Sequence, residues 1–146
     1  MKRFFLIIAT VLALLLSGCQ SDHGTDHSAY RDDMAKAQEI AVISADTAEV
    51  MDTITDTREI EDFVSALHVD QWELGTLKDK ASEIGTFGLA QEKTIQLGQT
   101  DTDGTLYDVA AITLYDGNYI RVEIDGFDMT FTVSKDTAEY LNGYFA

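Results

Sequence analysis

The sequence predicts an α+β domain, in which helices pack on one face of a mostly antiparallel sheet. Three observations predict it: two β-prone runs between positions 40 and 55, an amphipathic helix directly after them, and a strand meander that ends in a last helix. We read the elements in the order β-α-β-β-β-β-α. Residues 39–146 are long enough for one such domain and too short for two.

The clearest helix is expected to begin after Asp56. Aspartate is a good N-cap, and Glu59 follows at the spacing of a capping box. Apolar residues then recur at the i, i+3, i+4 and i+7 spacing of one helix face. They are Ile60, Phe63, Val64 and Leu67.

The segments around this helix are less regular. Residues 40–44 and 50–55 are rich in β-branched residues and are expected to be strands, and residues 30–39 a short helix. Residues 69–88 contain three glycines and are expected to form a long packed loop, followed by a strand at 89–97.

From Leu106 to Val133 the sequence predicts an antiparallel meander whose register side-chain alternation can test. A two-residue turn at Asp125-Gly126 and a three-residue loop at 116–118 place apolar residues opposite one another, with Asn118 in the left-handed conformation. A bulge at Ala110-Ala111 would bring Tyr107 and Val109 to the core face. Ser134 is expected to cap the last helix.

The first nineteen residues indicate a targeting signal. Lys2 and Arg3 precede thirteen residues, 4–16, that are apolar except for Thr10. A helix of that length spans roughly 20 Å, which is short of the roughly 30 Å hydrocarbon layer of a membrane. The run therefore fits the core of a signal peptide better than a permanent span.

The apolar run ends in Leu16-Ser17-Gly18-Cys19, which resembles the lipobox of bacterial lipoproteins. The resemblance implies cleavage between Gly18 and Cys19, a diacylglyceryl group on the Cys19 sulfur, and attachment to the membrane through that lipid. The alternative, an ordinary secretory signal, lacks an A-x-A-like site and leaves a single unpaired thiol in an exported protein. The predicted organisation is a signal peptide at 1–18, a lipidated cysteine and flexible tether at 19–38, and a domain at 39–146.

The expected location is the extracytoplasmic face of the cell membrane, or the outer membrane if the host is Gram-negative. Gln20, rather than aspartate, follows the cysteine, and the envelope type of the host stays open. The formal net charge of −16 excludes nucleic acid as a partner and disfavours electrostatic adhesion to anionic lipid. A protein or another envelope component is a further expected partner.

The domain also resembles small lipoproteins of Gram-positive bacteria in three short stretches. They are Ile54-Thr55-Asp56 with Glu59-Ile60, Leu114-Tyr115-Asp116-Gly117, and Tyr140-Leu141. This resemblance implies a location and a fold, and it carries no catalytic residues.

Two stretches contain metal-binding residue types. His23 and His27 stand four apart among aspartates, but a flexible tether does not hold ligands in a fixed geometry. Asp101 and Asp103 precede Gly104 as in a calcium loop, with Asp108 further on, yet the first and last positions of that loop are Gln99 and Ala110. We therefore predict no metal site and no cofactor, and keep the three aspartates as weak candidates.

One face of the meander is expected to be solvent-exposed and to offer a binding surface. The register places Tyr115 beside Tyr119 and Glu123 opposite Asp128, with Arg121 on the diagonal. Exposed tyrosines are common at interfaces and are also ordinary on strand exteriors.

No catalytic residues are predicted. His68 is the one histidine beyond the tether, and no nucleophile elbow, P-loop or dinucleotide motif occurs. The favoured hypothesis is therefore a non-enzymatic module of the cell envelope that binds a partner through this face. The alternatives are a calcium-binding protein and a hydrolase that uses clustered carboxylates.

Overall fold

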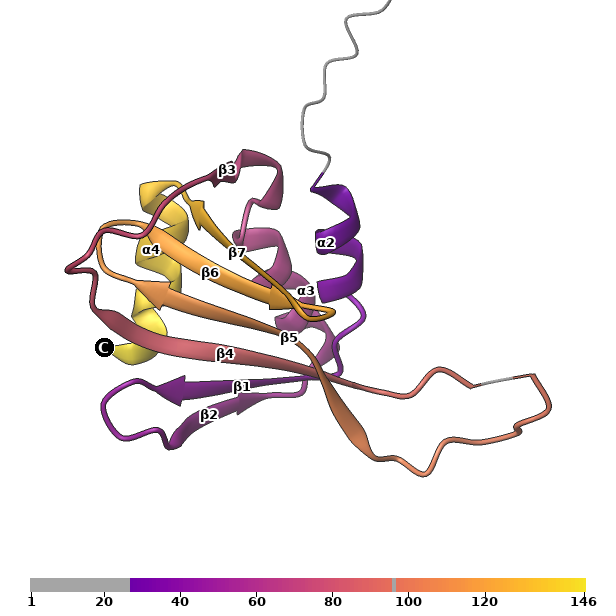
Figure 1. Ribbon diagram of the computed structural model, residues 1–146. Coiled ribbons are helices and arrows are strands. Elements are labelled where there is room, and N and C mark those ends of the chain that lie inside the picture. Colours follow the sequence, from indigo (N-terminus) through magenta and orange to yellow (C-terminus); the bar gives the residue numbers. More distant parts are fainter. Residues whose placement is uncertain (1–26, 96) are drawn as a thin grey trace, which may run out of the picture.

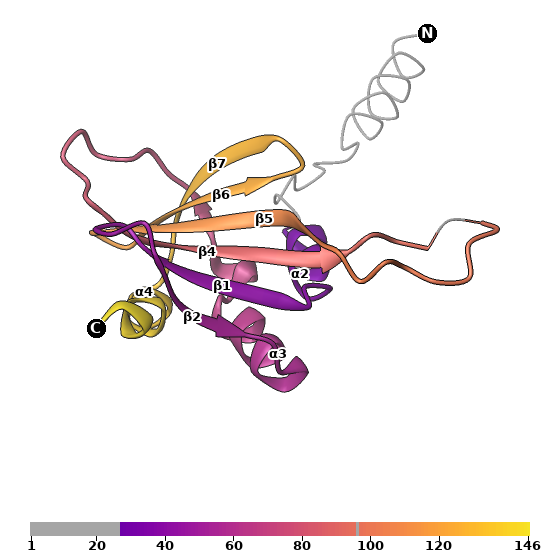
Figure 2. The same cartoon turned by 90° about the horizontal axis from the view of Figure 1, so that it is seen from below.

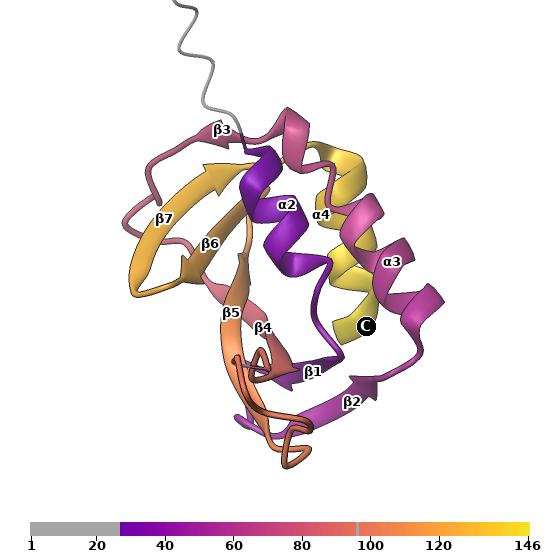
Figure 3. The ribbon, with the colours of Figure 1, turned by 90° about the vertical axis from the view of Figure 1, so that its right-hand side faces the viewer.

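The protein is seen in a computed structural model that describes residues 27–95 and 97–146. Seven antiparallel strands form one sheet in the order β2-β1-β4-β5-β6-β7-β3, and the helices cover one of its faces (Figure 1). The sheet curves around the helices, which lie together on its inner side (Figure 3). The predicted α+β class is confirmed.

The strands are β1 (Glu39–Ser44), β2 (Val50–Ile54), β3 (Glu73–Leu74), β4 (Glu83–Glu92), β5 (Leu106–Tyr115), β6 (Tyr119–Ile124) and β7 (Phe127–Thr132). The helices are α2 (Ser28–Met34), α3 (Thr57–Ala66) and α4 (Lys135–Asn142), with short 3₁₀ helices η1 (Val69–Gln71) and η2 (Gly143–Phe145). In the part of the chain that the structure describes, no helix combines the length and apolarity needed to cross a bilayer.

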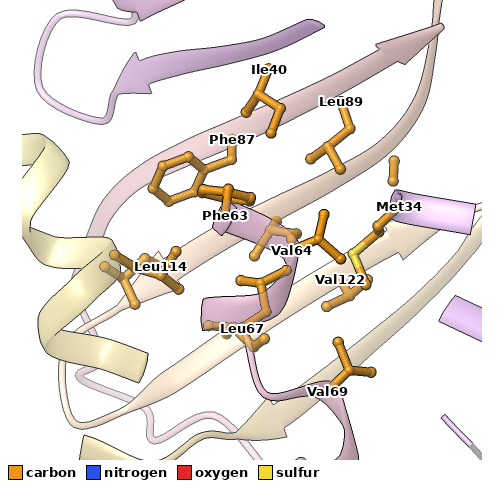
Figure 4. Packing of buried hydrophobic residues seen from close by; sticks show 14 of the residues in the cluster. Met34, Ile40, Phe63, Val64, Leu67, Val69, Phe87, Leu89, Leu114 and Val122 are labelled. Atoms are coloured by element: carbon orange, nitrogen blue, oxygen red, sulfur yellow. The ribbon is translucent and has the colours of Figure 1, made fainter. Parts of the chain in front are cut away.

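The core lies between α3 and the inner face of the sheet. The Phe63 ring of α3 packs against Phe87 of β4 with their centroids 5.0 Å apart, and both side chains are fully buried (Figure 4). Leu67 and Trp72 close the far side of this layer, where the Trp72 Nε1 group donates a hydrogen bond of 2.8 Å to the Leu67 carbonyl oxygen. Burial of these large side chains is the main stabilising term.

Helices α3 and α4 begin after the N-cap residues that the sequence predicts, Asp56 and Ser134. The Asp56 carboxylate accepts hydrogen bonds from the backbone N–H groups of Arg58 and Glu59, at 2.9 and 3.1 Å. The Ser134 hydroxyl accepts one from the N–H of Thr137 at 3.2 Å. Each bond satisfies a donor that the first helical turn leaves without a partner.

The meander has the predicted register. Ile112 pairs with Val122 and Leu114 with Ile120 across β5 and β6, and the predicted β6–β7 pairs are all present. Asn118 takes the expected left-handed conformation at φ 65°. Pairing apolar residues on one face is therefore sufficient to identify both turns in this segment.

Residues 69–88 differ from the predicted loop. They contain η1 and β3, and β4 begins at Glu83 rather than at residue 89. Gly85 and Gly88, which indicated a loop, both lie inside β4. The predicted order β-α-β-β-β-β-α therefore lacks β3. It also lacks α2 and one of the two strands that precede α3, although the sequence indicated a helix and two strands in that region.

The bulge also lies elsewhere than predicted. Leu89 pairs with Ala110 and Ala90 with Asp108, so Val109 is the extra residue on β5. Tyr107 does not reach the core, because its side chain remains 39% exposed and lies beneath the Lys93 ammonium, 4.6 Å from the ring centroid. The bulge bends β5 toward its connection with β4, which extends away from the sheet (Figure 2).

The N-terminal boundary of the folded body differs from the expected 39. Helix α2 packs on the core through Met34, which is fully buried, and Ala37 is also buried. The His27 ring packs edge-on against Phe131, with centroids 5.4 Å apart. Residues 27–38, which the sequence assigned to the tether, are therefore part of the packed structure.

The two glycines of β4 should respond oppositely to alanine. A Cβ at Gly85 would lie 2.1 Å from the Phe145 ring, so the ring must move and lose packing, whereas a Cβ at Gly88 meets only Ile43 Cδ1 at 4.0 Å. We expect Gly85→Ala to lower the free energy of unfolding by about 1–3 kcal/mol. The matched control, Gly88→Ala, should leave it unchanged or raise it by about 0.5–1 kcal/mol. Urea unfolding monitored by Trp72 fluorescence measures both, and equal losses would contradict this reading of β4.

Candidate ligand site on the outer face of the sheet

The outer face of the sheet carries a hollow of about 530 Å³. It extends over β1, β4, β5 and β6 and reaches the turn between β6 and β7. The helices lie behind the strands in Figure 1, which looks onto this face. Alternation along the strands places the hollow opposite the core.

Three small residues form the floor of the hollow. Ala41 of β1 pairs with Gly88 of β4, and Gly88 pairs with Ala111 of β5, so the three lie side by side across the sheet. Their neighbours in the strands, such as Val42 and Phe87, point into the core. Thr86 stands beside this row, with its hydroxyl 3.0 Å from that of Thr113. Because this row carries no side chain larger than a methyl group, the backbone of the sheet is accessible from the outer face here.

Four carboxylates surround the floor, and no basic side chain lines it. They belong to Glu39, Asp108, Glu123 and Asp125. Among the described residues, none of the four forms an ion pair. A smaller hollow that shares Asp125 with this one is lined by Lys36, but the Lys36 ammonium binds Asp33 at 2.9 Å. The hollow is therefore a site of uncompensated negative charge over an apolar floor.

The face expected from the sequence lies beside this hollow, and two of its three charged residues, Arg121 and Asp128, are paired with each other. Tyr115 lies opposite Tyr119 and Glu123 opposite Asp128, as predicted. The Arg121 guanidinium binds the Asp128 carboxylate through two hydrogen bonds, one of 2.6 Å from Nε to Oδ1. This contact and a hydrogen bond with the Tyr115 hydroxyl raise the pKa of Arg121, and the same pair lowers the pKa of Asp128. Glu123 alone of these residues also lines the hollow.

The weak calcium candidates are not brought together. Asp101 and Asp103 lie on the connection between β4 and β5, while Asp108 lies in β5 opposite Ala90. The Asp103 carboxylate accepts a 3.0 Å hydrogen bond from the backbone N–H of Thr105, which lowers its pKa. Across residues 27–95 and 97–146, no group of three or more histidine, cysteine, aspartate or glutamate side chains has a geometry that could hold a metal ion.

The predicted lipidation and cleavage sites lie outside the described part of the chain. Cys19 is predicted to carry the lipid, and cleavage is predicted between Gly18 and Cys19; His23 of the tether also lies outside the described residues. His27, the other tether histidine, is described and is buried beside Tyr30 and Phe131 rather than free to bind a metal.

Sequence reasoning missed the floor of the hollow. Ala41 and Ala111 are unremarkable in isolation, and Gly88 was assigned to a loop. They form a row only through the pairing of β1, β4 and β5. The available signal was a strand that continues through two glycines, and alternation of Phe87 and Leu89 on the core face would have identified it.

The chain has one match among solved structures and none among protein families or curated sequences. No protein-family model and no curated protein sequence matches the chain. One solved structure with a similar fold is a thioesterase-like protein from Clostridium sporogenes ATCC 15579. It is 14% identical, the match covers 75% of this chain and 94% of that one, and the TM-score is 0.39.

The favoured hypothesis of a non-enzymatic binding module is corrected by this finding. The structural neighbour is described as thioesterase-like, which overturns the expectation, and we do not retain it. At this identity and TM-score, the likeness transfers no activity, substrate or residue role to the chain. The physical reason for abandoning the expected face is independent of the comparison: Arg121 and Asp128 satisfy each other.

The Arg121–Asp128 pair should be visible in the titration of Asp128. Because Arg121 holds the pKa of Asp128 below its usual value of about 3.9, any stabilisation from the pair is present above that pH and is lost as pH falls through the lowered value. Replacing the cation in Arg121→Met should move the Asp128 pKa upward in a carboxyl carbon NMR titration. Lys135→Met removes a cation bound to Glu139 on α4 and should leave Asp128 unchanged. An unchanged Asp128 pKa in Arg121→Met would show that the pair does not form in solution.

Proposed function

We propose that the chain is the precursor of a bacterial lipoprotein, whose domain is held on the extracytoplasmic side of a membrane by lipid on Cys19. The observation that carries this proposal is Leu16-Ser17-Gly18-Cys19 directly after the apolar run at 4–16. The signal is specific because all four positions and their placement agree, and because Cys19 is the single cysteine of the chain.

Charge supports lipid rather than electrostatic attachment. Cleavage after Gly18 removes Lys2 and Arg3 and leaves 8 basic against 26 acidic residues, a formal net charge of −18. Anionic lipid headgroups repel such a body, so a covalent anchor is needed to keep it at the surface. Two or more acyl chains hold a protein stably, whereas a single chain binds only marginally.

The length of chain between the anchor and the folded body limits how far the domain can stand from the membrane. Eight residue steps separate Cys19 from His27, whose ring is already buried in the domain. A fully extended chain spans at most about 3.5 Å per residue, so these steps reach roughly 28 Å at most. We therefore expect the domain to work within about its own diameter of the membrane surface.

The proposal predicts that lipid attachment and cleavage depend on the Cys19 sulfur. Expression of the full precursor in a bacterial host should yield a membrane-bound protein that lacks residues 1–18 and whose mass includes a diacylglyceryl group. Cys19→Ser replaces the sulfur with oxygen and cannot form the thioether, so its mass should include residues 1–18 and no lipid.

A control must show that Cys19→Ser folds like the wild-type protein. Its thermal unfolding should match that of the wild-type domain, since position 19 precedes the packed residues. If the wild-type protein carried no lipid by mass, or if Cys19→Ser carried the same lipid mass, the lipoprotein proposal would be wrong.

A further inference from the structure

Among the described residues, no contact of Gly88 requires a glycine at this position. Its backbone is not in the left-handed region, and a Cβ built there meets only the end of the Ile43 side chain at 4.0 Å. Gly85, three residues earlier in β4, differs because the Phe145 ring occupies the space of a side chain. Glycine inside a strand is unfavourable, and it often marks a bulge, a tight bend, or a place where a ligand or another backbone approaches closely. The bulge at Val109 lies one residue beyond Gly88, between Leu89 and Ala90, whereas Gly88 itself pairs regularly with Ala111.

The neighbours of Gly88 extend this opening across the sheet. Ala41 and Ala111 flank it in register, so the floor of the hollow crosses three strands, about 10 Å from the first to the third. The surface of the floor is formed by Cα hydrogen and methyl groups. Such a surface favours contact with the methylene chain of an extended ligand.

The carboxylates around the floor are spread apart rather than gathered at one point. Glu39 and Asp108 both lie opposite Ala90, on the two sides of β4, so their Cα atoms are two strand spacings apart, about 10 Å. Glu123 lies beyond Ala111 on β6, and Asp125 is in the next turn. This arrangement does not enclose a single ion, in agreement with the lack of a metal-holding group among the described residues. It complements a ligand whose positive charges are themselves separated.

We propose that the outer hollow binds a linear aliphatic polyamine, with its methylene chain on Ala41, Gly88 and Ala111. Its ammonium groups donate hydrogen bonds to the carboxylates of Glu39, Asp108 and Glu123, which have no basic partner in the described structure. The exposed position of these carboxylates makes binding sensitive to salt. The site is independent of the lipid anchor and of the route by which the protein reaches the membrane.

Isothermal titration with spermidine, on the lipidated protein in a non-ionic detergent at low ionic strength, tests this proposal. We expect one molecule to bind per chain. Gly88→Val fills the floor and should weaken binding at least tenfold, while its unfolding midpoint stays equal to or above that of the wild type. Ala111→Val provides a second filling variant in case Gly88→Val fails to fold.

Charge and position are separated by matched variants. Asp108→Asn and Glu123→Gln should each weaken spermidine binding several-fold. Glu83→Gln, which removes an exposed carboxylate in the same strand as Gly88 but outside the hollow, and Thr130→Val, on the outer face of β7, should not change it. 1,8-Octanediol, a chain with no charge, should not bind.

Three results would overturn the proposal. The first is no spermidine binding at millimolar concentration. The second is spermidine binding that Gly88→Val and Ala111→Val leave unchanged, which would indicate diffuse attraction to an acidic surface. The third is binding of an oligolysine peptide with no binding of spermidine, which would assign the face to a protein segment.

Discussion

Packing of α3 against the inner face of the sheet decides where the rest of the chain lies. The contact of Phe63 with Phe87, both fully buried, joins the helix to the central strand pair. Because side chains alternate along a strand, burying Phe87 and Leu89 turns Gly88 outward, and burying Ile112 turns Ala111 outward. The position of the hollow is thus a consequence of the core on the opposite side.

The two faces of the sheet consequently have different chemistry. The inner face is large and apolar, and aromatic rings from α3, β4 and the C-terminal residues fill it. The outer face has a self-paired half, where Arg121 and Asp128 bind each other, and a hollow half with unpaired carboxylates. At α4, burial and a 2.9 Å contact with the Tyr144 hydroxyl raise the pKa of Tyr140, so this ring remains neutral and belongs to the packing. The chemistry available to a ligand is therefore concentrated on the hollow half.

Sequence reasoning succeeded where a local signal and the tertiary structure agree. Asp56 and Ser134 cap helices, and the apolar pairs of β5, β6 and β7 admit one register. It failed where a long-range contact overrides a local signal. Gly85 reads as a loop residue, yet it lies in β4 because Phe145, sixty residues later, packs over it. The hollow could not be found for the same reason, since Ala41, Gly88 and Ala111 become neighbours only when β1, β4 and β5 pair.

The claim that the outer hollow is a ligand site is tested most directly by the alanine methyl groups. Methyl NMR spectra recorded during a spermidine titration observe both faces of the sheet at once. The signals of Ala41 and Ala111 should shift together and saturate, while that of Ala138, which is buried on the core side and does not line the hollow, stays in place. Unshifted Ala41 and Ala111 signals, or equal shifts of all three, would contradict the account.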